Sequence, residues 1–125
     1  MNKLPKNLIT GTAGELLVQL RLFQFGVQAA PPLKDTGNDL IAVKGNQFRA
    51  VQVKTTGNED NNWSKTGLDR EFHILALVRL RGGAEYELDR SDVYLYDKSE
   101  VVGGQWNDLA EHRISRPLIE RLFQE

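Results

Sequence analysis

The first amphipathic segment of the chain runs from about Thr12 to Phe25. Three apolar side chains recur there at the spacing of one helix face, with Leu17 beside them: Leu16, Leu20 and Phe23. This pattern predicts an α-helix. Gly26 is expected to end it, because glycine readily adopts the left-handed conformation that follows a helix. Residues 27–30 are expected to form a short extended piece.

Two strands joined by a tight turn are predicted next. The first covers residues 39–43 and the second residues 48–55, and the turn lies between them at 44–47. Side chains along a strand alternate between its two faces, so Gln52 and Lys54 share a face. Because the chain doubles back at the turn, the start of the first strand is expected to meet the end of the second.

The segment from Phe72 to Val78 is nearly all apolar, which is typical of a strand covered on both faces and so near the middle of a sheet. Further strand is expected at Tyr86 and Leu88 and over residues 93–96. The last helix is predicted from a cap, a proline in the first turn and an apolar stripe: Ser115, Pro117, Leu118, Ile119, Leu122 and Phe123. The order of elements predicts an α/β fold with a mixed central sheet flanked by helices.

Composition narrows the classes of function. The chain has 125 residues, which predicts a single domain over residues 1–125. Sixteen Lys and Arg against seventeen Asp and Glu give a net charge of −1, which excludes a uniformly basic surface but not a local basic cleft. Disulfides, thiolate zinc sites and cysteine nucleophiles are excluded because there is no cysteine. No apolar run reaches the roughly 18 residues of a membrane span, so a cytoplasmic protein is expected.

The hairpin carries the most informative chemistry. Asp39 at its open end, together with Gln52 and Lys54, is expected to place a carboxylate, an amide oxygen and an ammonium at one edge of the sheet. Mg²⁺ prefers oxygen ligands and usually takes only one or two carboxylates. Asp39, Gln52 and the backbone carbonyl of Val53 could hold it, with Glu15 on the first helix as a second carboxylate. Lys54 could then position an attacking water or stabilise charge on a phosphate.

These residues resemble the PD-(D/E)xK nuclease superfamily. Asp39, twelve intervening residues and then Gln52-Val53-Lys54 are similar to the Gln-x-Lys signature of type IV restriction nuclease domains and Holliday-junction resolvases. The segment from Gly11 to Glu15 is similar to the start of their first helix, and the resemblance covers roughly residues 8–80. It implies a restriction-endonuclease-like αβββαβ core and a DNA endonuclease dependent on Mg²⁺, which Mn²⁺ could replace. Glu15, Asp39, Gln52 and Lys54 are the matching active-site positions.

The sequence departs from the superfamily pattern at two positions, and one of them weakens the metal site. Asn38 precedes Asp39 where the name-giving motif has proline, and Gln52 replaces a second acidic ligand. One negative charge is therefore missing unless Glu15 takes part. A nuclease fold that cuts poorly or not at all, and instead binds nucleic acid or a protein partner, remains the alternative function.

Each site residue also has a structural interpretation. Thr12 and Glu15 fit a capping box, in which the hydroxyl and the carboxylate satisfy backbone amides at a helix start. Asp39 fits a turn, since aspartate is common there. Gln52 fits a half-buried strand position, and Lys54 fits a solvated charge. Only the coincidence of all four favours the nuclease interpretation.

The polar interval from Gly57 to Glu71 is long for a structureless loop, and such loops are often functional. It follows Thr55 and Thr56 directly and carries an aromatic and two cations: Trp63, Lys65 and Arg70. Contact with nucleic acid is expected of Thr55, Thr56, Lys65, Arg70 and Lys44. Trp63 and Trp106 are expected to cover the core, as are the paired Tyr94 and Tyr96. His73 is interpreted as a strand residue and His112 as a surface residue.

The small size of the chain predicts a homodimer. Single modules cover only about 600–1,000 Å² of a DNA-binding interface, and a dimer would supply two sites for two strands. The apolar residues from Val93 to Tyr96, or the last helix, are the expected interface. A separate protein partner could also supply targeting to DNA.

Overall fold

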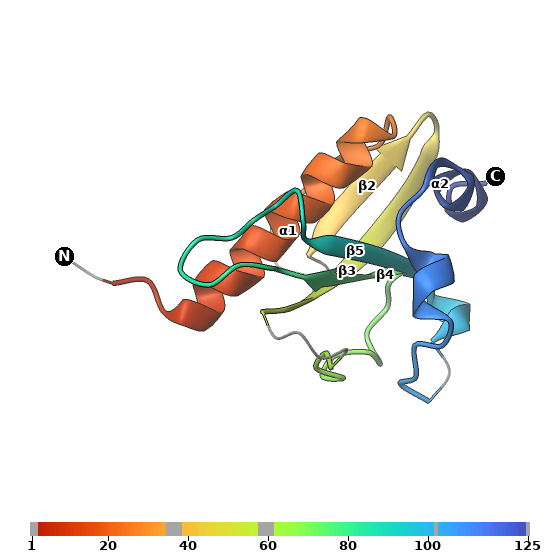
Figure 1. Cartoon of the computed structure of the whole chain (residues 1–125). Coiled ribbons are helices and arrows are strands. Elements are labelled where there is room, and N and C mark those ends of the chain that lie inside the picture. The colour runs from red at the N-terminus through yellow and green to blue at the C-terminus, as the bar shows by residue number, and fades with distance from the viewer. Residues whose placement is uncertain (1–2, 35–38, 58–61, 102, 125) are drawn as a thin grey trace.

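The computed structural model describes residues 3–34, 39–57, 62–101 and 103–124. In these residues five strands form one sheet in the order β1-β2-β3-β4-β5, with α1 lying along it (Figure 1). Neighbouring strands are antiparallel, except that β3 and β4 are parallel. The predicted α/β class and mixed sheet are therefore confirmed. The elements are α1 (Lys6–Gln24), β1 (Gln28–Ala30), β2 (Leu40–Lys44), β3 (Gln47–Thr56), β4 (Ile74–Arg79), β5 (Asp92–Asp97), the 3₁₀ helices η1 (Lys98–Glu100) and η2 (Leu109–His112), and α2 (Arg116–Leu122).

Helix α1 starts earlier than predicted but ends where predicted. It begins at Lys6 after Pro5, so residue 12 lies in its second turn rather than at its start. Gly26 follows the helix with φ of 81°. Its N–H donates to the Phe23 carbonyl, and the next N–H donates to the Leu22 carbonyl, each at 3.0 Å. This pair of bonds satisfies carbonyls that the end of a helix leaves open.

The face of α1 that packs on the sheet was not the one suggested by the strongest apolar repeat. Gly14, Leu17, Val18 and Leu22 are buried against the sheet. Leu16, Leu20 and Phe23 lie on the outer side, and Phe23 is 67% exposed. The helix is therefore apolar on two sides, and only one of them enters the core.

The predicted hairpin is confirmed almost residue by residue. Strand β2 pairs with β3 from Leu40 opposite Val51 to Lys44 opposite Gln47. A two-residue turn joins them, and Gly45 there has φ of 59°, a conformation that glycine adopts without strain. Asp39 directly precedes β2.

The connection between the parallel strands β3 and β4 differs from the expected αβββαβ core. Parallel neighbours need a long crossover, which is usually helical. In the described part of this connection, residues 62–73, the chain forms turns and no helix. All six residues of β4 are buried, and the strand lies between β3 and β5, as its apolar sequence predicted.

The two faces of the sheet carry separate cores. On one face the α1-side core joins both α-helices to alternate residues of β3, β4 and β5, Val51, Ala76 and Leu95 among them. The opposite face carries the Trp63 cluster: Trp63, Phe72, Leu75, Leu77, Tyr94 and Tyr96. The Trp63 indole N–H donates to the Val78 carbonyl at 2.9 Å. The expectation that Trp63, Tyr94 and Tyr96 pack in the core is confirmed, and Trp106 packs partly buried against this cluster.

Three expectations about the second half of the chain are wrong. Tyr86 and Leu88 are not in a strand, because the chain there runs along α1, where the Tyr86 hydroxyl lies 2.8 Å from Thr10 Oγ1. His112 is not a surface residue. It is 9% exposed, stacks on Tyr96 at 3.9 Å between ring centroids, and its Nε2 lies 2.9 Å from Glu100 Oε2. The residues from Val93 to Tyr96 are buried within the chain and offer no apolar interface.

The last helix begins as predicted, but its apolar stripe is not exposed as an interface. Ser115 caps α2, because its hydroxyl accepts from the Leu118 N–H at 3.3 Å, and Pro117 lies in the first turn. The expected stripe is buried within the chain, so this helix also offers no apolar interface.

His73 lies just before β4, and its Nδ1 accepts from the Ala50 N–H at 2.8 Å. No helix among the described residues is long and apolar enough to cross a membrane.

Candidate active site

The candidate site lies where β3 runs on beyond the start of its neighbour β2. Strand β2 begins opposite Val51, so the edge of β3 from Gln52 onward has no β2 residue beside it. Asp39 closes this gap. Its N–H donates to the Val51 carbonyl at 3.2 Å. Its Oδ2 accepts from Gln52 Nε2 at 3.1 Å and from the Val53 N–H at 2.8 Å.

Glu15 reaches the same point from α1. Burial, and secondarily the charge and hydrogen bonding of Asp39, raise the pKa of the Glu15 carboxyl above its ordinary value. Two carboxylates therefore face each other at this edge of the sheet. The capping interpretation of Glu15 is wrong, because the helix begins at Lys6 and Thr12 lies inside it.

The close approach of α1 to β3 depends on Gly14, one residue before Glu15. A Cβ atom at Gly14 would lie 1.9 Å from Thr55 Oγ1, which is far inside van der Waals contact. Only glycine lets the helix lie this close. The same contact leaves Thr55 Oγ1 buried and without a hydrogen-bond partner in the structure.

Gln52 presents an acceptor that nothing in the structure satisfies. The side chain is 4% exposed, its Nε2 is used by Asp39, and its Oε1 is buried with no hydrogen-bond partner. An unpaired buried carbonyl oxygen is costly, and in native proteins it calls for an explanation such as an ion. Two carboxylates that crowd each other beside a free amide oxygen are a donor set that fits Mg²⁺. The described residues contain no cluster of three or more His, Cys, Asp or Glu that could hold a metal ion.

Lys54 lies on the same face of β3 as Gln52. Its ammonium donates to the Thr66 carbonyl, in the connection between β3 and β4. Burial lowers the pKa of Lys54, the Asp39 charge opposes that shift, and the Arg70 charge adds to it. The structure thus brings all four predicted residues, Glu15 and Asp39 with Gln52 and Lys54, to one place.

These residues line a cleft of about 670 Å³. Its other wall comes from the first turns of α1 and includes Lys6, Asn7, Thr10 and Gly11. Sequence reasoning missed Lys6, Asn7 and Thr10, because it began the helix at residue 12. The available signal was Pro5, since proline favours a helix start.

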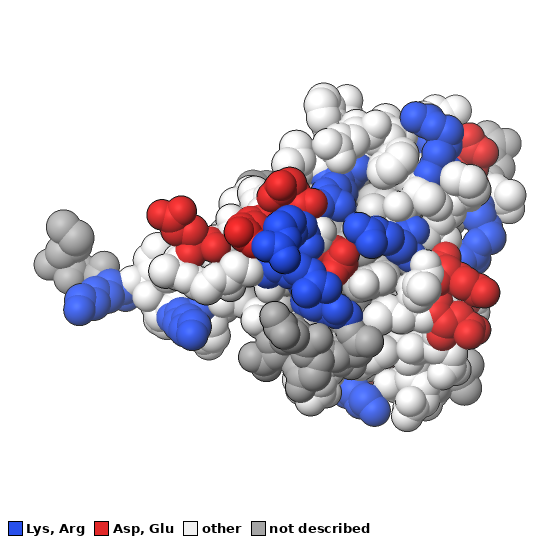
Figure 2. Space-filling view, viewed as in Figure 1, with Lys and Arg blue, Asp and Glu red and all other residues white. Residues whose placement is uncertain are grey.

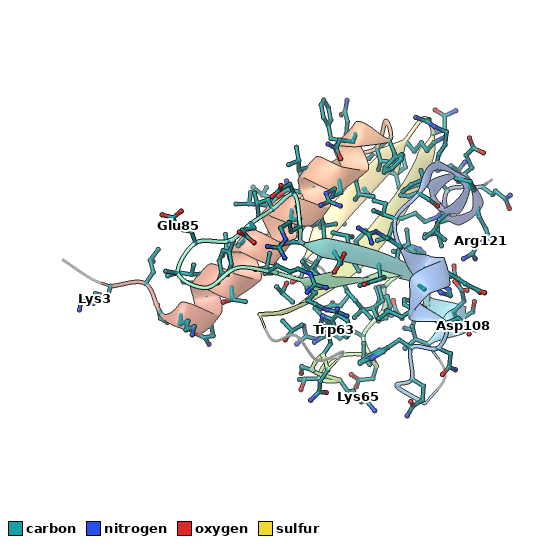
Figure 3. The ribbon with its side chains drawn as sticks, viewed as in Figure 1. Lys3, Trp63, Lys65, Glu85, Asp108 and Arg121 are labelled. Carbon is teal, nitrogen blue, oxygen red and sulfur yellow. The ribbon has the colours of Figure 1, made fainter. Side chains whose placement is uncertain are left out.

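The residues expected to contact nucleic acid are not all at the cleft. Thr55 lines it, Thr56 is buried, and Arg70 is close enough to influence Lys54. Lys65 lies elsewhere, with its Nζ 5.8 Å from the centre of the Trp106 ring. Figure 3 shows Lys65 at the outer side of the segment that carries Trp63. Lys44 lies at the far end of β2, beside the hairpin turn.

Comparison with known proteins gives a match of fold. No protein-family model and no curated protein sequence matches the chain. Among solved structures, the chain is similar to the bacterial homing endonuclease I-Ssp6803I, with a TM-score of 0.65 and 15% identity. The similarity covers 96% of this chain and 95% of that one. At this level of identity the two share a fold over nearly their whole lengths.

Proposed function

We propose that the chain is a metal-dependent DNA endonuclease of the PD-(D/E)xK type, in its Gln-x-Lys form. The observation that carries the proposal is the unsatisfied Gln52 Oε1 beside two facing carboxylates, Asp39 and Glu15. The fold supports it, because the similar structure is that of a homing endonuclease. The spacing of the four residues in the sequence supports it independently.

In this proposal the metal is Mg²⁺, which Mn²⁺ can replace. Asp39, Glu15, the Gln52 amide oxygen and the Val53 carbonyl would hold it. The bound cation would supply positive charge opposite the phosphate and make a nearby water more acidic. It would also relieve the repulsion by Asp39 that, after burial, raises the pKa of Glu15.

Lys54 acts on the substrate side of the cleft. Its ammonium donates hydrogen bonds, so it can orient the attacking water or stabilise the charge that develops on the phosphate oxygens. The Thr66 carbonyl holds the end of its side chain. The water oxygen forms a bond to phosphorus and loses a proton to solvent, while the bond to the leaving oxygen breaks and that oxygen takes up a proton from solvent. Lys6, Asn7 and Thr10 form the opposite wall, where they would contact the backbone of the DNA.

The test is cleavage of supercoiled plasmid, linear duplex and branched DNA with Mg²⁺ and with Mn²⁺. The wild-type chain should cut at least one substrate, and Asp39→Asn should abolish cutting while it keeps the fold. Asp89→Asn, an identical chemical change at an exposed turn, is the matched control and should cut normally. Failure of the wild type to cut any substrate with either metal, or undiminished cutting by Asp39→Asn, would refute the proposal.

A binding module without catalysis is the second candidate. The observation that favours it is the small number of acids at the site, where Gln52 stands in place of the second acidic ligand of the superfamily pattern. Calorimetric titration with Mn²⁺ separates the two functions. An endonuclease should bind the ion through Asp39, whereas a binding module should bind DNA equally well with and without metal.

We also propose that the functional unit is a homodimer joined through the outer face of α1. This face carries Leu8, Thr12, Leu16, Leu20 and Phe23, and no charged residue. It includes a shallow apolar hollow of about 370 Å³ at its N-terminal half. A neutral apolar stripe of this length does not suit DNA, which needs cations, but it can pack against its own copy about a two-fold axis.

A further inference from the structure

A second hollow, distinct from the cleft, lies at the ends of β3 and β4. Its volume is about 410 Å³. Three arginines and one carboxylate, Arg79, Arg81, Arg90 and Glu87, line it together with glycines at positions 57, 82 and 83. Figure 2 shows basic side chains gathered in front of β5, with acidic side chains beside them. We call this hollow the arginine pocket.

Arg79 is the anomalous member of the pocket. It is 8% exposed, its Nε is buried without a hydrogen-bond partner, and no ion pair is found for it among the described residues. Its guanidinium lies over the rings of Trp63 and Tyr94, at 5.7 and 6.0 Å from their centres. The aromatic faces offset part of the cost of burying a cation, but they supply no counter-charge. A buried guanidinium in this state is complementary to an anion.

The other two arginines are already paired, which fixes their place at the rim. Arg81 donates to Asp92 at 3.0 Å, and Arg90 donates to Glu87 at 2.9 Å. Arg113 also contacts Asp92, at 3.3 Å, so that carboxylate is shared between two guanidinium groups. Positive charge therefore remains in excess around the pocket.

The glycines leave room for a ligand of some size. Gly82 has φ of 107°, and a Cβ there would lie 2.2 Å from the Glu85 carbonyl, so the loop turns sharply without a side chain. A Cβ at Gly83 would meet nothing within 4 Å. One wall of the pocket is thus bare backbone beside three guanidinium groups, a combination that suits the oxygens of a phosphate.

The pocket also lies along the same strand as the cleft. Gly57 follows Lys54 by three residues, or about 10 Å along an extended strand. Thr56 pairs with Arg79 across β3 and β4. Phosphates repeat along a nucleic-acid strand, so a backbone that occupies the cleft could place a neighbouring phosphate here. We infer that the arginine pocket binds a backbone phosphate of the nucleic acid, beside the one that is cut, an inference that rests on the proposed function.

The test is binding of a fluorescent duplex oligonucleotide without metal, measured by anisotropy over a series of salt concentrations. Arg79→Gln should weaken binding about tenfold and lower the salt slope by about one phosphate contact. Gly83→Glu places a carboxylate at the open wall without touching the buried arginine, and should weaken binding similarly. Arg116→Gln, at an exposed arginine on α2, is the control and should bind as the wild type does.

The outcomes separate this inference from the proposed function. Equal affinity and salt slope for Gly83→Glu and the wild type would overturn the phosphate pocket, even if the protein cuts DNA. A wild type that never cuts, but whose oligonucleotide binding falls with Arg79→Gln and Gly83→Glu, would uphold the pocket and refute the nuclease. If inorganic phosphate raises the melting temperature through this pocket while DNA binding ignores both variants, the ligand is a free anion and the inference is wrong.

Discussion

At the scale of single residues, the carboxyl groups of Glu15 and Asp39 favour the binding of a cation in the cleft. The pKa of the Glu15 carboxyl is raised by burial and by Asp39. A carboxyl with a raised folded pKa stabilises the fold fully below its ordinary pKa, and this contribution is lost as the pH rises through the folded value. Near neutral pH, the ionised pair of Glu15 and Asp39 therefore costs stability that a bound metal would recover.

Substitution of Glu15 should separate stability from metal binding. Glu15→Gln removes the repulsion, so the free energy of unfolding without metal should rise at neutral pH, by no more than about 0.5 kcal/mol after solvent screening. The gain should vanish in acid, where the wild-type carboxyl is already protonated. The same variant should bind Mn²⁺ more weakly by calorimetry. Glu120→Gln, an exposed glutamate on α2, should change neither measurement, and a Glu15→Gln protein with intact Mn²⁺ binding would exclude Glu15 as a ligand.

Three of the four central residues could be placed from the sequence, because a short turn fixes which residues of a hairpin meet. Asp39, Gln52 and Lys54 needed only strand alternation and that turn. Glu15 could not be assigned a role, since capping and site placement depend on where the helix begins. The sequence also could not predict that Arg79 is buried without an ion pair, because its surroundings include aromatic rings from two distant segments.

Among the elements, α1 and β3 form the contact on which the cleft depends. Gly14→Ala would force the helix away from Thr55, because the new Cβ has no space. The free energy of unfolding should fall by about 1–3 kcal/mol in urea denaturation. Gly11→Ala is the matched control on the same helix, where a Cβ meets nothing within 4 Å. It should raise stability by about 0.5–1 kcal/mol, and a Gly14→Ala protein as stable as Gly11→Ala would contradict the close packing.

Glu100, where η1, η2 and α2 meet, should make the free energy of unfolding depend on pH in the acidic range. Burial would raise the pKa of Glu100, but hydrogen bonds from His112 and the Asp97 N–H, with the Arg121 charge, outweigh it and lower the pKa. The resulting stability is present above the ordinary glutamate pKa and is lost as the pH falls through the lowered folded value.

Glu100→Gln should therefore lower the free energy of unfolding by about 1–2 kcal/mol at neutral pH. Its deficit relative to the wild type should shrink at an acidic pH below the lowered folded pKa, where the wild-type carboxyl is protonated as well. Urea denaturation at the two pH values measures this difference, with Glu111→Gln as the exposed control. A deficit that is the same at both pH values would show that the ionised carboxylate contributes nothing.

The elements themselves were predictable where local chemistry decides them. Gly26 and Ser115 marked helix ends, and the apolar run of β4 marked an inner strand. The burial of α1 was not predictable from periodicity, since both of its sides are apolar and Gly14 decides between them. The strand expected at Tyr86 failed because this aromatic packs on α1 instead of pairing in the sheet.

At the scale of the whole molecule, the outer face of α1 is the surface through which we propose that two copies of the chain associate. Leu16→Glu combined with Leu20→Glu should convert the proposed dimer to a monomer at micromolar concentration, measured by light scattering. The charges lie on the exposed side, so the fold should remain. Phe48→Glu introduces a charge at an equally exposed aromatic on β3 and should leave the dimer intact. A wild-type protein that is already monomeric would refute the interface.

The positions of the two tryptophans allow intrinsic fluorescence to report the unfolding of one side of the sheet. Both tryptophans of the chain, Trp63 and Trp106, lie on the face of the sheet away from α1, with ring centres 6.2 Å apart. Intrinsic fluorescence therefore follows one side of the sheet, while far-ultraviolet circular dichroism is dominated by α1 on the other. If the two signals lose intensity at the same denaturant concentration, the two cores unfold as one cooperative unit. If fluorescence changes first, the segment that holds Lys54 through Thr66 opens before the helix does.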